Sequence, residues 1–181
     1  MKTISLALDG MHPVRDDLRV AFAQPDGVQV LLHRGGRPAW FLEMAWDGTE
    51  TVGCGDRFYA EPAPYGFSLI ATLNGRPAGY LSAELSRGRD GEGEAHIEMV
   101  QVDADHRGAR IGSALAAGLA EILLRGMEGS VSSGHEPSPY SVTGDTQSRT
   151  ADLLIARLQR VLDAEFDTCL ARYEAGEEPG P

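Results

Sequence analysis

The chain has 181 residues, of which 42% are hydrophobic and 24% are charged, close to the averages of globular proteins. A chain of this length can fold as one domain and bury a core without disulfides or metals. Asp and Glu number 27 against 16 Lys and Arg, for a net charge of −11. Nucleic-acid binding needs clustered positive charge, so nucleic acid is not an expected partner. An acidic surface would attract cationic ligands such as amines, or simply keep the protein soluble.

The two cysteines, Cys54 and Cys169, are far apart and neither belongs to a CxxC pair. We therefore expect no metal site and no disulfide framework. The N-terminus lacks the long apolar stretch of a signal peptide, and no stretch has the length of a membrane span. These features predict a cytoplasmic protein without membrane association, and the sequence leaves open whether it forms a homodimer.

Residues 1–65 are expected to form a strand-rich N-terminal portion. Strands are predicted at residues 18–23 and 28–33, joined as a hairpin by an Asp-Gly turn. A further strand is predicted at residues 39–46, which would complete a meander.

The pattern is clearer after residue 66. Two apolar runs at residues 67–73 and 78–85 flank Asn74-Gly75, a strong hairpin signal because both residue types tolerate positive φ. A charged loop then leads to a predicted strand at residues 95–102. Residues 111–125 are rich in Ala and Leu and predict a helix that faces a sheet.

The C-terminal part is predicted to contain a short strand at residues 130–132, a polar loop and a last helix over residues 149–174. Either Ser148 or Thr150 could cap this helix. The tail at residues 175–181 is expected to fray.

The segment at residues 96–115 carries the chemistry. A strand ends there in a short turn that leads directly into a helix, so several backbone N–H groups converge. The helix dipole, Arg107 and Arg110 add positive charge, while Gly108 and Gly112 let a ligand approach the backbone. Such a turn can bind phosphates, or it can be an ordinary turn whose small residues allow close packing.

The turn reads Arg-Gly-Ala-Arg-Ile-Gly over residues 107–112, and it resembles the acyl-CoA signature Gln/Arg-x-x-Gly-x-Gly/Ala of the GNAT superfamily of N-acetyltransferases. The resemblance covers residues 66–132 as a core within one domain spanning 1–181. It implies an α+β fold with a mixed, mainly antiparallel sheet and flanking helices. Arg110 stands where the family usually has Gly, so the N–H at this position must bind despite a side chain, which is feasible in helical φ/ψ. Two helices after the first strand and the final two strands of the family are not recognisable.

The same resemblance implies acetyl-CoA as co-substrate. Main-chain groups of Val100, Gln101 and Val102 would pair with the pantetheine, and the turn would hold the pyrophosphate. The residues of the turn and first helical positions are Arg107, Gly108, Ala109, Arg110, Ile111, Gly112 and Ser113.

Direct attack of an amine on a thioester needs a base for the ammonium and a donor for the thiolate. Period-two alternation places His96, Glu98, Val100 and Val102 on one strand face, flanking one cleft. In the histone-acetylating branch of the family a strand glutamate is the base at the position of His96. Glu98 is a candidate base or water-chain anchor, and an unperturbed histidine pKa near 6.5 would suit His96 as base. Tyr140 is the candidate acid for the thiolate. For His96, Glu98 and Tyr140 the alternative is a side chain without a catalytic role that is only solvated or packed.

The predicted function is therefore acetyl transfer from acetyl-CoA to a primary amine of a small molecule or peptide. The same scaffold could transfer another acyl group. A different alternative is a non-catalytic member that senses acyl-CoA or serves as a protein-interaction module. No sequence feature identifies the acceptor.

Overall fold

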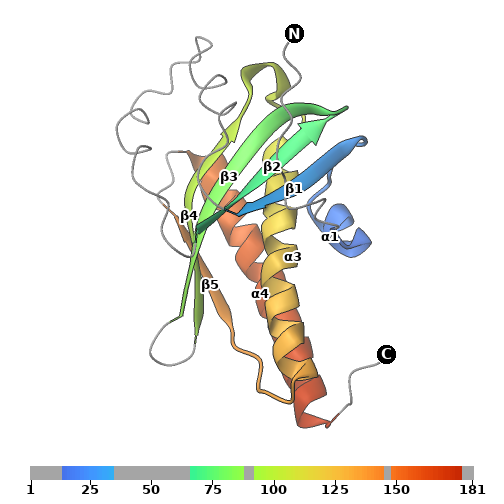
Figure 1. Cartoon of the computed structure of the whole chain (residues 1–181), viewed down its shortest axis with the longest axis vertical. Coiled ribbons are helices and arrows are strands. Elements are labelled where there is room, and N and C mark those ends of the chain that lie inside the picture. Colours follow the sequence, from blue (N-terminus) through green and yellow to red (C-terminus); the bar gives the residue numbers. More distant parts are fainter. Residues whose placement is uncertain (1–13, 35–65, 88–91, 145–147, 177–181) are drawn as a thin grey trace.

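The structure, a computed structural model, describes residues 14–34, 66–87, 92–144 and 148–176 (Figure 1). Within them one sheet is covered on one face by two long helices that lie side by side. The elements in chain order are α1 (Asp16–Ala21), β1 (Val28–Arg34), β2 (Gly66–Leu73), β3 (Arg76–Arg87), β4 (Gly93–Val102), the 3-10 helix η2 (Ala104–His106), α3 (Ile111–Ser132), β5 (Tyr140–Gly144) and α4 (Arg149–Glu174).

The sheet has five strands in the order β1-β2-β3-β4-β5. All neighbours are antiparallel except β4 and β5, which are parallel. The predicted hairpin is confirmed, since Asn74 and Gly75 have φ of 52° and 75° and join β2 to β3. The predicted α+β fold with a mixed, mainly antiparallel sheet is likewise confirmed.

The start of α3 is fixed closely against the sheet. A Cβ added at Gly79 of β3 would come within 2.6 Å of Ile111 Cγ2, so glycine is what permits this approach. Beyond it, residues 114–120 of α3 are all buried, since the helix contacts the strands as well as α4 and α1. This packing places the first turn of α3 beside the end of β4.

The predicted strand at residues 18–23 is wrong, because these residues include most of α1. Leu18 and Phe22 are four residues apart and both are buried, which is the spacing of one helix face. The predicted hairpin does not form, and β1 pairs with β2 instead. The strand predicted at residues 39–46 lies outside the described residues.

The predicted strand at residues 130–132 is also wrong. Met127 and Val131 stay buried at helical spacing, so α3 continues to Ser132. The predicted polar loop contains β5, which has a single buried residue, Val142. The cap of α4 is Ser148, whose hydroxyl accepts from the Ala151 N–H at 3.2 Å.

The outer edge of β5 is covered by one side chain of α4. Gln159 Nε2 donates to the Tyr140 carbonyl at 2.9 Å, and the Val142 N–H donates to Gln159 Oε1 at 2.8 Å. An amide has the same donor and acceptor as a peptide unit, so Gln159 replaces a neighbouring strand at this point.

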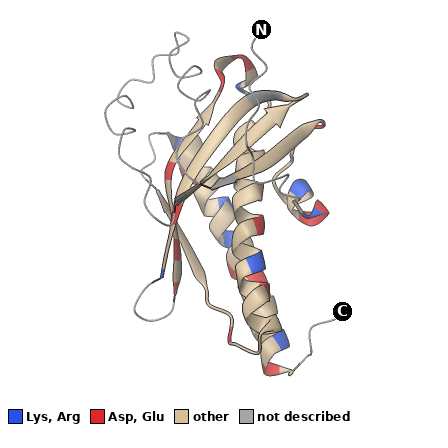
Figure 2. Cartoon of the chain, viewed as in Figure 1, with Lys and Arg blue, Asp and Glu red and all other residues tan. Residues whose placement is uncertain are grey.

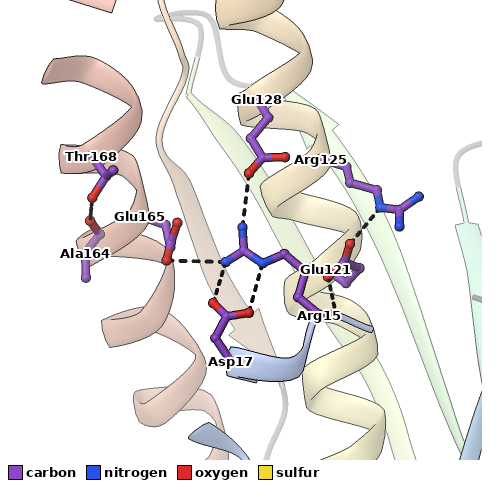
Figure 3. Close-up of polar contacts among 8 residues, drawn as sticks. All are labelled: Arg15, Asp17, Glu121, Arg125, Glu128, Ala164, Glu165 and Thr168. Atoms are coloured by element: carbon purple, nitrogen blue, oxygen red, sulfur yellow. Dashed lines mark hydrogen bonds and ion pairs between the residues drawn. The ribbon is translucent and has the colours of Figure 1, made fainter. Parts of the chain in front are cut away.

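Arg15 joins the start of α1 to both long helices (Figure 3). Its guanidinium lies 2.9 Å from Asp17, 3.0 Å from Glu128 of α3 and 3.3 Å from Glu165 of α4. Its backbone N–H donates to the buried Glu121 at 3.0 Å. Burial acts to lower the pKa of Arg15, but the surrounding carboxylates outweigh it and the pKa is raised. None of the described helices is both long and apolar enough to cross a membrane.

Candidate functional site

The parallel ladder between β4 and β5 is short. It runs from Gly93 opposite Tyr140 to Ile97 opposite Gly144. Residues 99–102 of β4 pair with β3 on one side, and residues 98–102 have no partner among the described strands on the other. The described ladder therefore ends at Ile97, and we call the outer side of residues 98–102, which pairs with no described strand, the opening.

The unpaired edge of β4 exposes specific backbone groups. The Asp103 N–H donates to the Ala78 carbonyl at 3.0 Å, so the backbone N–H of Asp103 points toward β3. In an antiparallel pair successive residues face alternate sides, so the N–H and C=O of Gln101 also face β3. Those of Val100 and Val102 point away from β3, toward the opening.

Glu98 is a bulge residue that directly follows the last described β4–β5 pair. Ser82 lies opposite Met99 and Ala83 lies opposite Ile97, which leaves Glu98 as the extra residue of β4. A bulge interrupts the alternation of a strand, so residues on either side of Glu98 change face.

The bulge makes the predicted common face of four β4 residues wrong. Ile97 belongs to the core under the helices, and after the bulge Val100 and Val102 pack against that same core. His96 alternates with Ile97 and therefore lies on the opposite face, together with Glu98, whose partner Ser82 is outside the core.

The face away from the helices carries buried polar groups around Glu98. The Ser82 hydroxyl donates to Glu98 Oε2 at 2.5 Å. The hydroxyls of Tyr80 and Ser68 are 2.8 Å apart, and both residues are buried. Sequence reasoning missed Ser68, Tyr80 and Ser82; the period of two along β3, where Tyr80 and Ser82 alternate with core residues, was the available signal.

His96 takes part in a chain of hydrogen bonds across β4 and β5. Its Nδ1 is 2.9 Å from Thr143 Oγ1, and that hydroxyl donates to Glu94 Oε1 at 2.9 Å. Thr143 lies directly opposite His96 in the parallel register, and Glu84 lies opposite His96 on β3. Figure 2 shows the acidic residues of these strands in red along this edge of the sheet. Thr143 could not be found from the sequence because β5 was not predicted.

The turn between β4 and α3 contains two residues with positive φ. Gly108 has φ of 83°, and Arg110, the N-cap residue of α3, has φ of 59° and ψ of 24°. The expectation that Arg110 adopts helical φ/ψ is wrong, because it is left-handed, a conformation that glycine adopts without steric cost. The N–H of Ala109 is used within the turn, where it donates to the His106 carbonyl at 3.1 Å.

Four consecutive N–H groups follow at the start of α3. The first backbone hydrogen bond of the helix is from the Ala114 N–H to the Arg110 carbonyl, at 3.1 Å. The N–H groups of Arg110, Ile111, Gly112 and Ser113 find no acceptor within the described part of the chain. They are available to an anion.

The surroundings of these N–H groups are positively charged and open. Arg107 and Arg110 are exposed, and neither pairs with a carboxylate among the described residues. A Cβ at Gly108 would meet nothing within 4 Å, and one at Gly112 would only reach Val102 Cγ2 at 4.0 Å. A diphosphate fits this combination of free donors, charge and space.

Tyr140 lies at the other end of the β4–β5 ladder. Its ring covers Gly93, and its hydroxyl is 2.9 Å from where a Cβ of Gly126 would be. Four residues, about 13 Å along β4, separate Gly93 from Ile97, where the opening begins. The structure therefore brings His96 and Glu98 to the opening and places Tyr140 in a packing position. Within the described ranges no group of His, Cys, Asp and Glu is placed to hold a metal ion.

Comparisons with known proteins agree with this geometry. The sequence matches the Acetyltransferase (GNAT) family over residues 28–131, and no curated protein matches it significantly. A solved ribosomal-protein-alanine N-acetyltransferase from Brucella melitensis biovar Abortus 2308 is 20% identical, with a TM-score of 0.51 over 72% of this chain and 89% of its own. Naa50 of Arabidopsis thaliana, in complex with the bisubstrate analogue CoA-Ac-MVNAL, is 18% identical (TM-score 0.46, 70% and 77%). An aminoglycoside acetyltransferase from an uncultured soil metagenomic sample is 15% identical (TM-score 0.39, 54% and 59%). The Brucella protein shares the fold, and because the family match spans more than half of the sequence, the chain belongs to the GNAT acetyltransferase family.

Proposed function

We propose that the protein transfers an acetyl group from acetyl-CoA to a primary amine by direct attack. The observation that carries this proposal is the continuity of one edge. It begins at the N–H groups of α3 that have no described acceptor, runs along the backbone of Val102 and Val100 that no described strand pairs, and ends at Glu98, next to the last β4–β5 pair at Ile97.

Each part of this edge suits one part of acetyl-CoA. The N–H groups of residues 110–113, with Arg107 and Arg110, would hold the pyrophosphate. The outward backbone groups of Val102 and Val100 would pair with the amides of the pantetheine as a neighbouring strand does. Val102 and Glu98 are four residues apart, about 13 Å, so the thioester would lie near the bulge.

Glu98 or its neighbour His96 would remove the proton from the amine. The ammonium gives one proton to the base, and the nitrogen lone pair forms a C–N bond to the acyl carbon. The C–S bond breaks with its electrons on sulfur, which takes the second nitrogen proton, so the products are an amide and the CoA thiol. Ser82 donates to one oxygen of Glu98 and leaves Oε1 to accept from the amine.

The acceptor is an amine of a small molecule or peptide. Glu84, Glu94 and Glu98 are close together on this part of the sheet, and the chain carries a net charge of −11. Both favour a cationic acceptor, because negative potential raises the local concentration of a cation. Arg107 and Arg110, which would hold the anionic co-substrate, lie at the other end of the edge.

Thermal unfolding with CoA, acetyl-CoA and ATP tests the binding site. A ligand at 100 times its dissociation constant adds about 2.7 kcal/mol to the free energy of unfolding. This corresponds to a rise in Tm of roughly 5–10 °C for a chain of this length. Gly112→Glu should abolish the response to both CoA species by placing a carboxylate among the free N–H groups. Gly129→Glu is the matched control on the same helix, at a glycine with nothing within 4 Å of its Cβ position. No response of the wild-type protein to either CoA species would refute the site.

Thiol release from acetyl-CoA with a panel of amines then tests catalysis. Glu98→Gln should lower kcat by roughly 10²-fold or more if Glu98 is the base, with little change in the thermal response to acetyl-CoA. Binding of CoA without thiol release for any amine would instead support the acyl-CoA sensor as the function.

A further inference from the structure

We propose that Thr143 and Glu94 are positioning residues that hold His96 in the tautomer with hydrogen on Nδ1, so that His96 Nε2 takes up the proton of the amine. This proposal rests on the proposed acetyl transfer and names the proton acceptor for it. It assigns a role to β5, which supplies Thr143.

The direction of the hydrogen bonds follows from the donors available. An ionised Glu94 can only accept, so the hydroxyl proton of Thr143 lies between Thr143 and Glu94. A hydroxyl has one proton, and its oxygen must therefore accept at its contact with His96 Nδ1, 2.9 Å away. Neutral imidazole carries a single N–H, so placing it on Nδ1 leaves the lone pair on Nε2.

The chain also stabilises the charged product of proton uptake. When Nε2 takes a proton the imidazolium still donates through Nδ1, and the negative charge of Glu94 lies one hydroxyl away. The other charged groups that face His96 among the described residues are Glu84, opposite on β3, and Glu98, two residues along β4. Glu84, Glu94 and Glu98 are all carboxylates.

The geometry gives Glu98 a separate task. It lies next to Ile97, the last described residue of β4 to pair with β5, and its carboxylate is fixed by Ser82. The ammonium of the acceptor would bind there first. Two residues along a strand span about 7 Å, a distance that a side chain or one water molecule bridges, so the proton can pass from the amine at Glu98 to His96.

The tautomer can be measured on the free protein. Long-range 1H–15N NMR spectra above pH 8 distinguish Nδ1–H from Nε2–H imidazoles, and His96→Gln identifies the His96 signal among the five histidines. We expect Nδ1–H in the wild-type protein, loss of that preference in Thr143→Val, and its retention in Thr143→Ser. An Nε2–H form in the wild-type protein, or a Thr143→Val spectrum identical to it, would overturn the proposal.

The pH dependence of kcat/KM for an amine tests the role in catalysis. The value of kcat/KM should rise with pH as His96 loses its proton, and we call this rising part of the pH profile the limb. His96→Gln should abolish the limb and lower kcat/KM by roughly 10²-fold. Thr143→Val and Glu94→Gln remove stabilisation of the imidazolium and should move the limb to lower pH, while Thr143→Ser restores it. Thr168→Val, which removes a threonine hydroxyl from α4, should change nothing.

The two measurements separate this proposal from the proposed function. The spectra are recorded without CoA or amine, so they decide the hydrogen-bond chain alone. If the wild-type protein shows the Nδ1–H form but transfers no acetyl group, the proposed function is refuted. If it transfers acetyl groups and the limb is unmoved by Thr143→Val, the positioning role is refuted and the function stands.

Discussion

Arg110→Gly should stabilise the folded protein. Arg110 is left-handed at the N-cap of α3, with φ of 59°, and its side chain makes no capping hydrogen bond. A side chain at Cβ collides with the following carbonyl in this conformation, which costs about 1–2 kcal/mol for an ordinary residue. Glycine avoids the collision, so the strain should disappear while the backbone of the turn stays as it is.

The expected gain is smaller than the strain, because glycine also gives the unfolded chain more freedom. That entropic cost is about 0.5–1 kcal/mol. The net stabilisation is then about 0.5–1 kcal/mol, or a rise in Tm of roughly 1–4 °C for a chain of this size. Differential scanning calorimetry or urea unfolding resolves such a change.

Two further variants separate backbone strain from charge. Arg110→Ala keeps the Cβ and the strain but removes the guanidinium, so its Tm should lie close to that of the wild-type protein. Ala23→Gly relieves a second left-handed residue, with φ of 47°, far from the turn, and should raise the Tm without changing the response to CoA. If Arg110→Gly is no more stable than Arg110→Ala, the left-handed N-cap is refuted.

Two predictions concern the helix layer. Arg15→Met should lower the free energy of unfolding by about 1–2 kcal/mol, since each partly exposed ion pair contributes about 0–1 kcal/mol. Urea unfolding measures this change, with Arg160→Met as the control at an exposed arginine. Equal stability of the two variants would contradict the prediction. Burial, then the charge of Glu128, raises the pKa of the Cys169 thiol. In a Cys54→Ser background its thiol should react with a disulfide reagent far more slowly when folded than in urea. The unfolded thiol ionises first, so stability should be unaffected below pH 8 and fall as pH rises past 9, and Cys169→Ala should lack this component.

The elements that the sequence predicted well are those whose pattern is local. Asn74-Gly75 encodes its own positive φ angles, and the Ala- and Leu-rich run of α3 has a helical period that tertiary contacts only extend. The strand predicted at residues 18–23 failed for the opposite reason. Leu18 and Phe22 suit a strand as well as a helix, and contacts with the rest of the fold decide between the two.

β5 was missed because its stability comes from its neighbours. Only Val142 is buried, so the strand has too few apolar residues to be recognised by alternation. Its backbone is paired by β4 on one side and by Gln159 on the other. A strand that depends on its neighbours in this way cannot be predicted from its own residues. For the same reason, the sequence could not predict that the Thr143 hydroxyl lies beside His96.

The predicted arrangement of the site failed at its two backbone irregularities. Regular alternation placed His96 and Glu98 beside Val100, and regular helical angles were expected for Arg110. The structure has a bulge at Glu98 and a left-handed residue at Arg110. The bulge lies at the start of the stretch of β4 whose outer backbone groups have no described partner, and Arg110 lies beyond its end, after η2. A bulge is a means of ending pairing and redirecting a side chain.

The positions of these two irregularities also separate the charges of the site. Before the bulge, the outward face of β4 carries Glu94 and His96, with Glu84 opposite. At the left-handed end are Arg107, Arg110 and the free N–H groups of α3. An amine and an anionic co-substrate would thus approach opposite ends of a single edge, of which the stretch from Val102 to Glu98 alone spans about 13 Å. A protein with a net charge of −11 can attract the amine through its surface as a whole, but it needs a localised positive site to hold the anion. We propose the turn as that site, which is why the variants at Gly112 and Arg110 test the proposal more directly than any change of the overall charge.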